Sequence, residues 1–549
     1  MVSKLSRRQF LAGSAAAALA AQSASASAQE PGAPDPSVEL IPLDQPGALT
    51  PTKLQQRADN AFLTRMRAAQ LERAQAVAQH PANGDEALYP EKVGTFTKTL
   101  PHNQLGEVDP DAYGALIDAI ESGEKAAFEA IPQGGPVALT NPQAAYAFDL
   151  SAPDPYQLPL DPAPSLASPQ AAAEMVEVYW HALLRDVGFD AYEGHPVVES
   201  ALVDLSRLVD FRAPKVNGRV TSKTLFRANT PGDLAGPYLS QFLYQPIPFG
   251  AHTIEQRNQT TVAGVNHMTA YDLWLAVQNG NAPETQAFDD TPRYLRNGRD
   301  LAEFVHQDFP GQAFLHAALI LMGMGAPFDP NNPYLNSRTQ KGFVLFDVAH
   351  VLNMVTYLAS CALKAAWFHK WLVNRRLRPE AFAGLIHNQR TGAKAYLIHN
   401  EALFAKALEE VQRRYGTYLL PMAYAEGCPT HPSYPAGHAT ISGACATVLK
   451  AFFDEDYVLP DPVAASADGL SLIPYRGDDL TVGGELNKLA SNISLGRDFA
   501  GVHYRSDGIK GMELGEALAM GFLAELKLTY HEPFEGFSFK TFDGAPVTV

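Results

Sequence analysis

Residues 431–443 read His-Pro-Ser-Tyr-Pro-Ala-Gly-His-Ala-Thr-Ile-Ser-Gly, and a mostly apolar stretch follows them. Pro432, Pro435 and Gly437 predict a constrained loop, after which a helix is expected to begin at His438. The first N–H groups of a helix lack intrahelical acceptors, and such groups bind anions. We therefore expect an anion to approach the main chain at Gly437, with the His438 imidazole placed to donate or accept a proton.

A second segment carries cations that an anion site requires. Residues 370–380 read Lys-Trp-Leu-Val-Asn-Arg-Arg-Leu-Arg-Pro-Glu. Lys370 and Arg378 are eight positions apart, so on one helix both side chains lean toward the same side. Pro379 is expected to end that helix and to turn the Arg378 guanidinium toward a pocket. The alternative for this segment is a cationic helix end that lies in solvent.

A third segment supplies another arginine and a histidine–aspartate pair. Residues 496–508 read Gly-Arg-Asp-Phe-Ala-Gly-Val-His-Tyr-Arg-Ser-Asp-Gly. Arg497 and His503 would point in opposite directions on an unbroken helix, but the glycines before Arg497 and at 501 predict a break that lets them converge. In the helix expected after the break, Asp507 lies at i, i+4 from His503 and can accept its Nδ1 proton, leaving Nε2 free as a nucleophile or ligand. The alternative is a surface ion pair worth under about 1 kcal/mol.

Composition and charge place these segments in a globular protein with a large core. The chain has 549 residues, of which 46% are hydrophobic and 18% are charged. Its formal net charge of −17 excludes general nucleic-acid binding and adhesion to an anionic membrane. A chain this acidic repels an oxyanion unless cations gather locally. The three cysteines, Cys361, Cys428 and Cys445, are too few for a disulfide framework or a cysteine metal cluster.

Helical periodicity dominates most of the chain, and sustained period-two alternation is scarce. One apolar helical stripe consists of Met175, Val178, Tyr179, Ala182 and Leu183. Helices are expected near residues 63–78, 314–324, 352–372, 395–411, 438–453 and 502–528. The sequence therefore predicts a mainly α, helical-bundle fold with few short strands.

The N-terminal residues indicate export. Arg7 and Arg8 precede a short alanine-rich apolar run, the pattern of a twin-arginine signal peptide. We expect a periplasmic or secreted protein without a membrane span. The prolines of residues 152–169 mark a boundary in the chain. The expected parts are a signal peptide at 1–28, an N-terminal accessory region at 29–170 and the helical-bundle domain at 171–549.

The three segments together resemble a family signature. A lysine, arginine-proline, proline-x-glycine-histidine and arginine-x5-histidine-x3-aspartate occur in the order found in vanadium-dependent haloperoxidases and the phosphatidic acid phosphatase type 2 superfamily. The Lys-Trp-x6-Arg-Pro-Glu spacing of residues 370–380 is similar to the bromoperoxidase group. So are residues 231–243, Pro-Gly-Asp-Leu-Ala-Gly-Pro-Tyr-Leu-Ser-Gln-Phe-Leu. The resemblance runs from about residue 60 to the C-terminus and is strongest over residues 350–515.

The resemblance implies a vanadate cofactor and a role for each matching position. His503 would be the axial vanadium ligand through Nε2, with Asp507 orienting its ring. His438 would hydrogen-bond the apical oxygen and act as the acid–base group, and His431 favours bromide and iodide over chloride. Lys370 would also polarise the bound peroxide. The equatorial oxygens would be neutralised by Lys370, Arg378, Arg497 and the Gly437 amide.

The implied enzyme is a bromoperoxidase-type haloperoxidase. It would oxidise bromide or iodide with hydrogen peroxide to a hypohalous equivalent that halogenates a small organic acceptor, and relatives of this group form homo-oligomers. Ala436 stands where the family commonly has serine, so one hydrogen bond worth about 1.5–3 kcal/mol is missing, which predicts weaker vanadate binding or an altered halide preference.

Two other functions fit the same residues. One is an exported phosphatase in which His503 forms a phosphohistidine and His438 is the leaving-group acid. The other is a non-catalytic oxyanion-binding protein.

Overall fold

The computed structural model describes residues 51–549 of the chain. The described residues fall into two units, one that ends at Ala74 and one of residues 75–549. The described part of the first unit is helix α2 (Pro51–Ala74), which begins earlier than the helix expected from residue 63. The expected signal peptide at 1–28 lies outside the described residues. The boundary expected near residue 170 lies inside residues 75–549 and stays a prediction.

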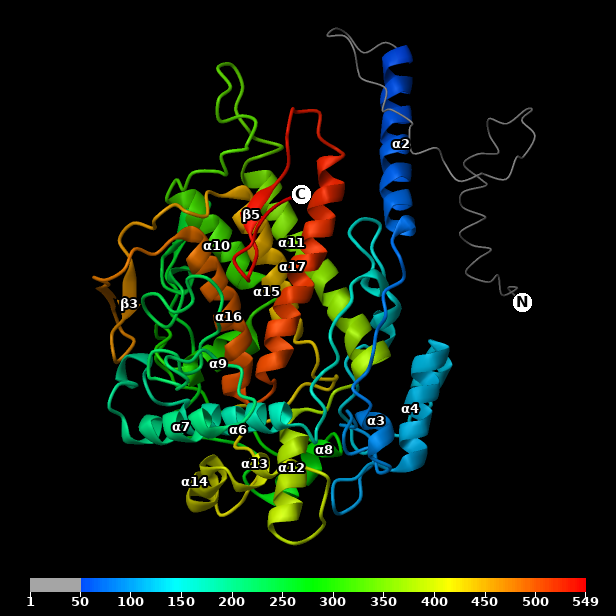
Figure 1. Ribbon diagram of the computed structural model, residues 1–549, viewed down its shortest axis with the longest axis vertical. Helices are drawn as coiled ribbons and strands as arrows, with labels where there is room; N and C mark the ends of the chain where they lie inside the picture. Colours follow the sequence, from blue (N-terminus) through cyan, green and yellow to red (C-terminus); the bar gives the residue numbers. More distant parts are fainter. Residues whose placement is uncertain (1–50) are drawn as a thin grey trace, which may run out of the picture. The chain divides into compact units, whose positions relative to one another are not determined.

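The second unit is mainly helical, as the sequence predicts (Figure 1). Its α-helices are α3 (Asp85–Leu88), α4 (Pro110–Ser122), α5 (Lys125–Glu129), α6 (Pro169–Leu184), α7 (Pro196–Arg207), α8 (Tyr271–Gln278), α9 (Gly298–Gln307), α10 (Gln312–Gly323), α11 (Val348–Phe368), α12 (Pro379–Arg390), α13 (Asn400–Phe404), α14 (Lys406–Tyr415), α15 (Gly437–Phe452), α16 (Val482–Ala500) and α17 (Arg505–Lys527). A π-helical turn, η5 (His369–Asn374), continues α11. The 3-10 turns are η1 (Pro142–Tyr146), η2 (Pro155–Gln157), η3 (Phe189–Ala191) and η4 (Gln241–Leu243).

Strands contribute little to this unit. In residues 51–549 they form short antiparallel hairpins, which are β1 (Ile247–Phe249) with β2 (His252–Ile254), β3 (Val463–Ala465) with β4 (Leu472–Pro474), and β5 (Ser538–Lys540) with β6 (Pro546–Thr548). The core is therefore built by packed helices.

Helix α15 lies in the middle of the bundle and packs on α11, α16 and α17 (Figure 1). Its contact with α17 is close because glycines face the other backbone. A Cβ on Gly443 would lie 2.1 Å from the Met512 carbonyl oxygen, and a Cβ on Gly515 would lie 2.0 Å from the Thr440 carbonyl oxygen. All residues of α15 except His438 are buried. Since α15 begins at Gly437, the core of the bundle positions the loop that precedes this helix.

Helix α6 crosses the bundle next to the start of α17 (Figure 1). Ser168 caps it by accepting a hydrogen bond from the Ala171 N–H, and Pro169 occupies its first position. The predicted apolar stripe is buried. Glu174 and Glu177, outside that stripe, are buried as well because they pair with arginines of other segments.

One expected helix is wrong, and one observed helix was missed. The single helix expected at 395–411 is replaced by α13 and α14, because Ala405 between them is extended. Helix α16 was not expected, since it is buried on all sides and rich in glycine, serine and asparagine, so it has neither an apolar stripe nor high helix propensity.

One described helix is long and apolar enough to cross a membrane. It comprises residues 348–374, which are α11 and η5, and 56% of its apolar window is buried inside the protein. Helix α11 packs on α10, α15 and α17 in the bundle. Since a core helix meets the same criteria of length and composition, this segment does not indicate a membrane span.

Candidate active site

Lys370 lies in η5, buried beside the loop that precedes α15. Its Nζ donates hydrogen bonds of 2.7 Å to the carbonyl oxygens of both Pro432 and Ser433. The helix expected to continue through Arg378 is wrong, because the chain leaves the helical conformation after Asn374. Lys370 is therefore held by the loop at 431–436 rather than by a shared helix face with Arg378.

Arg378 joins all three segments singled out in the sequence. Its Nε donates to the His431 carbonyl oxygen at 2.9 Å, and its Nη2 lies 3.0 Å from His431 Nδ1. Its Nη1 donates to the Val502 carbonyl oxygen at 2.6 Å and lies 3.1 Å from His503 Nε2. Arg378 has an extended backbone, as expected for a residue before proline, but Pro379 begins α12 and does not end the preceding helix.

His503 and Asp507 form the predicted pair in a different backbone setting. His503 Nδ1 donates to Asp507 Oδ2 at 2.8 Å. His503 lies in the link between α16 and α17, whereas Asp507 is in the first turn of α17 and also accepts from the Tyr504 N–H at 3.2 Å. The break occurs at Gly501, whose φ is 86°. The other glycine, Gly496, lies inside α16 against α9, so it makes no break.

Two side chains that sequence reasoning missed, Arg376 and Ser433, hold Asp507 in place, and a third, Glu174, holds Arg376. Arg376 Nη1 donates to Asp507 Oδ1 at 2.6 Å, and the Ser433 hydroxyl donates to Asp507 Oδ2. Arg376 also contacts Glu174 Oε2 at 3.1 Å. Burial alone would raise the pKa of the Asp507 carboxyl, but Arg376 and His503 hold this pKa well below its usual value. Arg376 and Ser433 lie in the quoted segments, but nothing in the sequence marks Glu174 as the partner of Arg376.

This environment keeps His503 neutral. Burial, followed by the positive charge of Arg378, lowers the pKa of His503 well below its usual value. Because Nδ1–H donates to Asp507 and an Arg378 N–H faces Nε2, the Nε2 lone pair is directed at the guanidinium. A neutral imidazole oriented by a carboxylate is what a metal ligand or a nucleophile requires.

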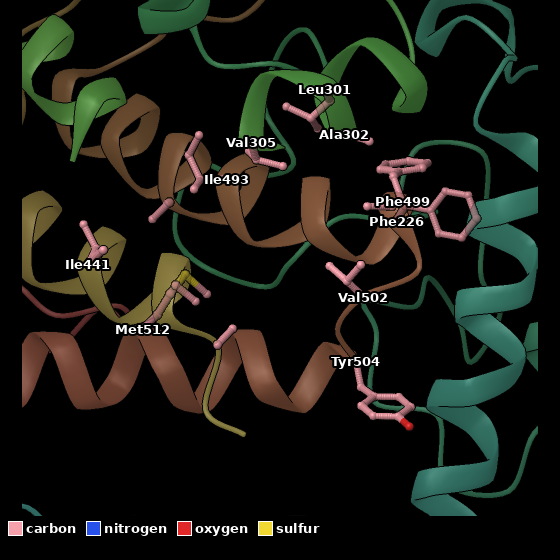
Figure 2. Packing of buried hydrophobic residues seen from close by; sticks show 14 of the residues in the cluster. Phe226, Leu301, Ala302, Val305, Ile441, Ile493, Phe499, Val502, Tyr504 and Met512 are labelled. Carbon is pink, nitrogen blue, oxygen red and sulfur yellow. The ribbon is translucent and has the colours of Figure 1, made fainter. Parts of the chain in front are cut away.

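Helix α9 supports two further predicted residues, Arg497 and His438. Arg497 Nη1 donates to the Val305 carbonyl oxygen at 2.7 Å, while Arg497 Nε has no partner among the described residues. His438 Nε2 lies 2.9 Å from Asp308 Oδ1, and its side chain is 30% exposed. Figure 2 shows Val305 of α9 packed against α16, the helix that carries Arg497. Asp308, which sequence reasoning missed, follows α9 directly.

The start of α15 presents free N–H groups, as predicted. Ala436 is its N-cap residue and provides no side-chain cap, so the N–H groups of Gly437 and His438 have no acceptor within residues 51–549. A Cβ on Gly437 would lie 3.3 Å from Leu363 Cδ1, so packing against α11 also favours glycine here. The close approach of an anion at Gly437 stays a prediction.

The remaining predicted residue, His431, faces Arg378 and packs on Trp367, with ring centroids 4.6 Å apart. Burial, then Arg378, lowers the pKa of His431 well below its usual value, so the ring is neutral. Its Nδ1 lies 3.0 Å from Arg378 Nη2 and 3.1 Å from the Pro432 carbonyl oxygen.

The cations of the site lack negative partners. In residues 51–549 no carboxylate lies within 4.0 Å of the charged groups of Lys370, Arg378 or Arg497, all of which are buried. Burial, then the charge of Arg378, lowers the pKa of Lys370 well below its usual value, and burial lowers the pKa of Arg378 to about 10. Buried positive charges without partners are costly, so this arrangement fits a bound oxyanion. No group of three or more His, Cys, Asp or Glu side chains in this part of the chain is arranged to hold a metal cation.

Several known proteins are similar to this chain in sequence. A family model described as the VCPO second helical-bundle domain matches residues 362–530. A vanadium-dependent bromoperoxidase from Ascophyllum nodosum is 39% identical over 524 residues, covering 90% of this chain and 92% of that protein. One from Corallina officinalis is 35% identical over 593 residues, covering 90% of this chain and 99% of that protein.

A solved structure agrees with these matches. The homohexameric structure of the second vanadate-dependent bromoperoxidase from Ascophyllum nodosum is 31% identical to the chain and has a TM-score of 0.85, with 96% of this chain and 95% of that chain covered. The predicted mainly α fold is thereby confirmed. The likeness extends over nearly the whole length of both chains, and the family model spans the three segments singled out in the sequence, so the chain belongs to the vanadium-dependent haloperoxidase family, in the group of the bromoperoxidases.

Proposed function

We propose that the protein is a vanadate-dependent haloperoxidase. It oxidises bromide or iodide with hydrogen peroxide to a hypohalous equivalent, which halogenates a small organic acceptor. The observation that carries this proposal is the group of buried cations without carboxylate partners around the neutral Nε2 of His503. The bromoperoxidase relatives support bromide among the halides.

The residues present fit vanadate. His503 Nε2 would bind the metal, and the N–H donors of Lys370, Arg378, Arg497 and the first turn of α15 would neutralise its oxygens. Arg497 Nε, buried and without a partner among the described residues, is the clearest donor available to such an anion. When bound, vanadate supplies a Lewis-acid centre that activates hydrogen peroxide.

The protein supplies proton transfer and orientation. His438 is paired with Asp308 and is partly exposed, so its imidazole can exchange a proton between the site and solvent. Asp507 keeps the Nδ1 proton of His503 in place, which leaves Nε2 as the ligand atom. Lys370 donates two of its N–H groups to loop carbonyls, which leaves the third ammonium N–H for the anion.

The decisive experiment compares the metal-free protein with the same protein after addition of vanadate. With bromide, hydrogen peroxide and a phenolic dye, we expect bromination only after vanadate is added. A phosphatase of the same superfamily would instead hydrolyse an aryl phosphate without vanadate. Aryl phosphate turnover that vanadate only inhibits, without any bromination, would contradict the proposal.

We also propose that the protein is a homo-oligomer. The similar structure is homohexameric. Apolar side chains are exposed on the loop between α10 and α11, where Phe343 is 74% and Val344 is 73% exposed. Light scattering coupled to size-exclusion chromatography should give a mass that is a multiple of 59.4 kDa, less the signal peptide if that is removed. A monomer at micromolar concentration would contradict this proposal.

Export by the twin-arginine route is a further proposal, supported by Arg7 and Arg8 ahead of the alanine-rich run. Replacing both arginines by lysine should keep the protein in the cytoplasm of a bacterial host that has this route. Unchanged export of the double variant would contradict it.

A further inference from the structure

A histidine at the end of α9 makes a second cluster, which the proposed chemistry does not use. His306 Nε2 lies 2.7 Å from Glu426 Oε1, and His306 Nδ1 lies 3.3 Å from Glu303 Oε2. The His306 ring is stacked on Tyr424, with centroids 3.8 Å apart and an interplanar angle of 11°. Glu303 and His306 belong to α9, whereas Tyr424 and Glu426 belong to the segment that leads into the loop at 431–436. His306 therefore ties two segments together.

Both of these segments touch Arg497. The Tyr424 hydroxyl donates to the Ala302 carbonyl oxygen at 2.6 Å and lies 3.4 Å from Arg497 Nη1. The Arg497 guanidinium carbon lies 5.6 Å from the centroid of the Tyr424 ring. The same guanidinium donates to the carbonyl oxygen of Val305, the residue before His306. Tyr424 thus contacts both His306 and Arg497.

The end of α9 also reaches His438. Asp308, the C-cap residue of α9, hydrogen-bonds His438 Nε2 at 2.9 Å. A shift of the last turn of α9 would therefore move the carbonyl that holds Arg497 and the carboxylate that holds His438 together.

We propose that His306 is a positioning residue of the oxyanion site. By joining the end of α9 to residues 424–426, it fixes the guanidinium of Arg497 and, through Asp308, the imidazole of His438. This inference rests on the proposed function, because the oxyanion it serves is the one proposed there. Neither His306 nor its carboxylate partners is among the residues proposed to hold the anion.

The charge of His306 strengthens the link between the segments. Burial alone would lower its pKa, but the hydrogen bonds to Glu303 and Glu426 raise the pKa of His306 to about 9. The titratable groups that face it are Glu303, Glu426 and Tyr424, with Asp308 and Lys98 next to these. Burial raises the pKa of Tyr424, so Tyr424 stays neutral where His306 titrates.

The test is the affinity for inorganic vanadate, measured by equilibrium dialysis, of the parent and matched variants. His306→Phe keeps a ring to stack on Tyr424 and removes both carboxylate contacts, and Glu426→Gln removes one charge at a half-exposed position. The control is His399→Phe on the surface near α13, where His399 Nδ1 lies 3.9 Å from Glu401. We expect His306→Phe to weaken vanadate binding by about tenfold, which is the lower end of the loss in affinity when a residue that orients a metal ligand is replaced. Glu426→Gln should weaken vanadate binding less.

A pH series separates positioning from general loss of structure. A histidine whose folded pKa is raised contributes its interaction fully below the ordinary pKa of 6.5 and loses it as the pH rises through about 9. The difference in vanadate affinity between the parent and His306→Phe should therefore shrink above pH 9.

The outcomes distinguish the two proposals. A parent protein that does not bind vanadate would contradict the proposed function itself. A parent that binds vanadate, with His306→Phe equal to His399→Phe or with a difference constant from about pH 6 to 10, would overturn the role of His306 alone.

Discussion

At the scale of single residues, the orientation of His503 depends on Asp507. Asp507→Asn keeps the shape of the side chain but removes the charge that Arg376 faces at 2.6 Å. The buried Arg376 is then left with Glu174, so we expect the free energy of unfolding to fall by about 3–5 kcal/mol. The affinity for vanadate should fall about 10–100-fold, because the variant no longer specifies the Nδ1–H tautomer of His503.

Urea unfolding and equilibrium dialysis against vanadate measure the two effects. Asp118→Asn on α4 is the matched control, since Asp118 is exposed and should change neither quantity. An Asp507→Asn variant with parental vanadate affinity would mean that Asp507 does not orient the ligand histidine.

The second prediction at this scale concerns Ala436. It is buried at the N-cap of α15, next to N–H groups without acceptors among the described residues. Ala436→Ser adds a hydroxyl that can donate to an oxyanion, so vanadate should bind about tenfold more tightly, the equivalent of about 1.5 kcal/mol. Dialysis of the variant beside the parent measures this ratio. Unchanged affinity would show that the hydroxyl accepts from the first turn of α15 as an ordinary helix cap and does not face the anion.

At the scale of elements, the close contact of α15 with α17 places the loop at 431–436 over His503. A Cβ on Gly515 would lie 2.0 Å from the Thr440 carbonyl oxygen, and a backbone atom cannot move aside as a flexible side chain does. We expect Gly515→Ala to lower the free energy of unfolding by about 1–3 kcal/mol, measured by urea unfolding.

Gly114→Ala is the matched control for this substitution. Gly114 lies in α4, and a Cβ there meets nothing within 4 Å, so the variant should be more stable than the parent by about 0.5–1 kcal/mol. If both substitutions stabilised the protein equally, helix propensity and not the contact of α15 with α17 would decide the stability of the Gly515→Ala variant.

At the scale of the whole molecule, the site exists only in the folded protein, because its segments are separated by more than a hundred positions between Lys370 and Asp507. Vanadate that binds the folded state alone should stabilise it by about 2.7 kcal/mol at a concentration one hundred times Kd. The expected result is a melting temperature that rises with vanadate concentration, measured by differential scanning calorimetry. His503→Ala removes the proposed ligand atom, so its melting temperature should not respond; a parental response in this variant would contradict the ligand assignment.

The net charge of the whole chain differs in sign from the charge of the site. A chain with a formal net charge of −17 repels anions over its surface as a whole, yet its buried cations gather at one place. The local potential of the site therefore has the opposite sign to that of the molecule, which fits an oxyanion cofactor held by buried donors.

The mainly α class, the start of the helix after the 431–436 loop, and the pairing of His503 with Asp507 could be predicted from the amino-acid sequence alone. These follow from local causes: apolar periodicity, loop-forming prolines and glycine, and a spacing that sets which side chains meet. The sequence also placed the cations of the site in the right segments, although their roles with vanadate stay predictions.

How those residues are held depends on contacts that form only in the folded protein. Packing between distant segments sets the π-helical turn at Lys370 and the burial of α16 on all sides. It also places Arg378 at the N-cap of α12 instead of on the helix that carries Lys370. The same holds for the partners of Asp507 and His438, since Arg376 and Asp308 reach them across the fold. Contacts between residues far apart in sequence leave no periodic signal, so spacing could not predict them.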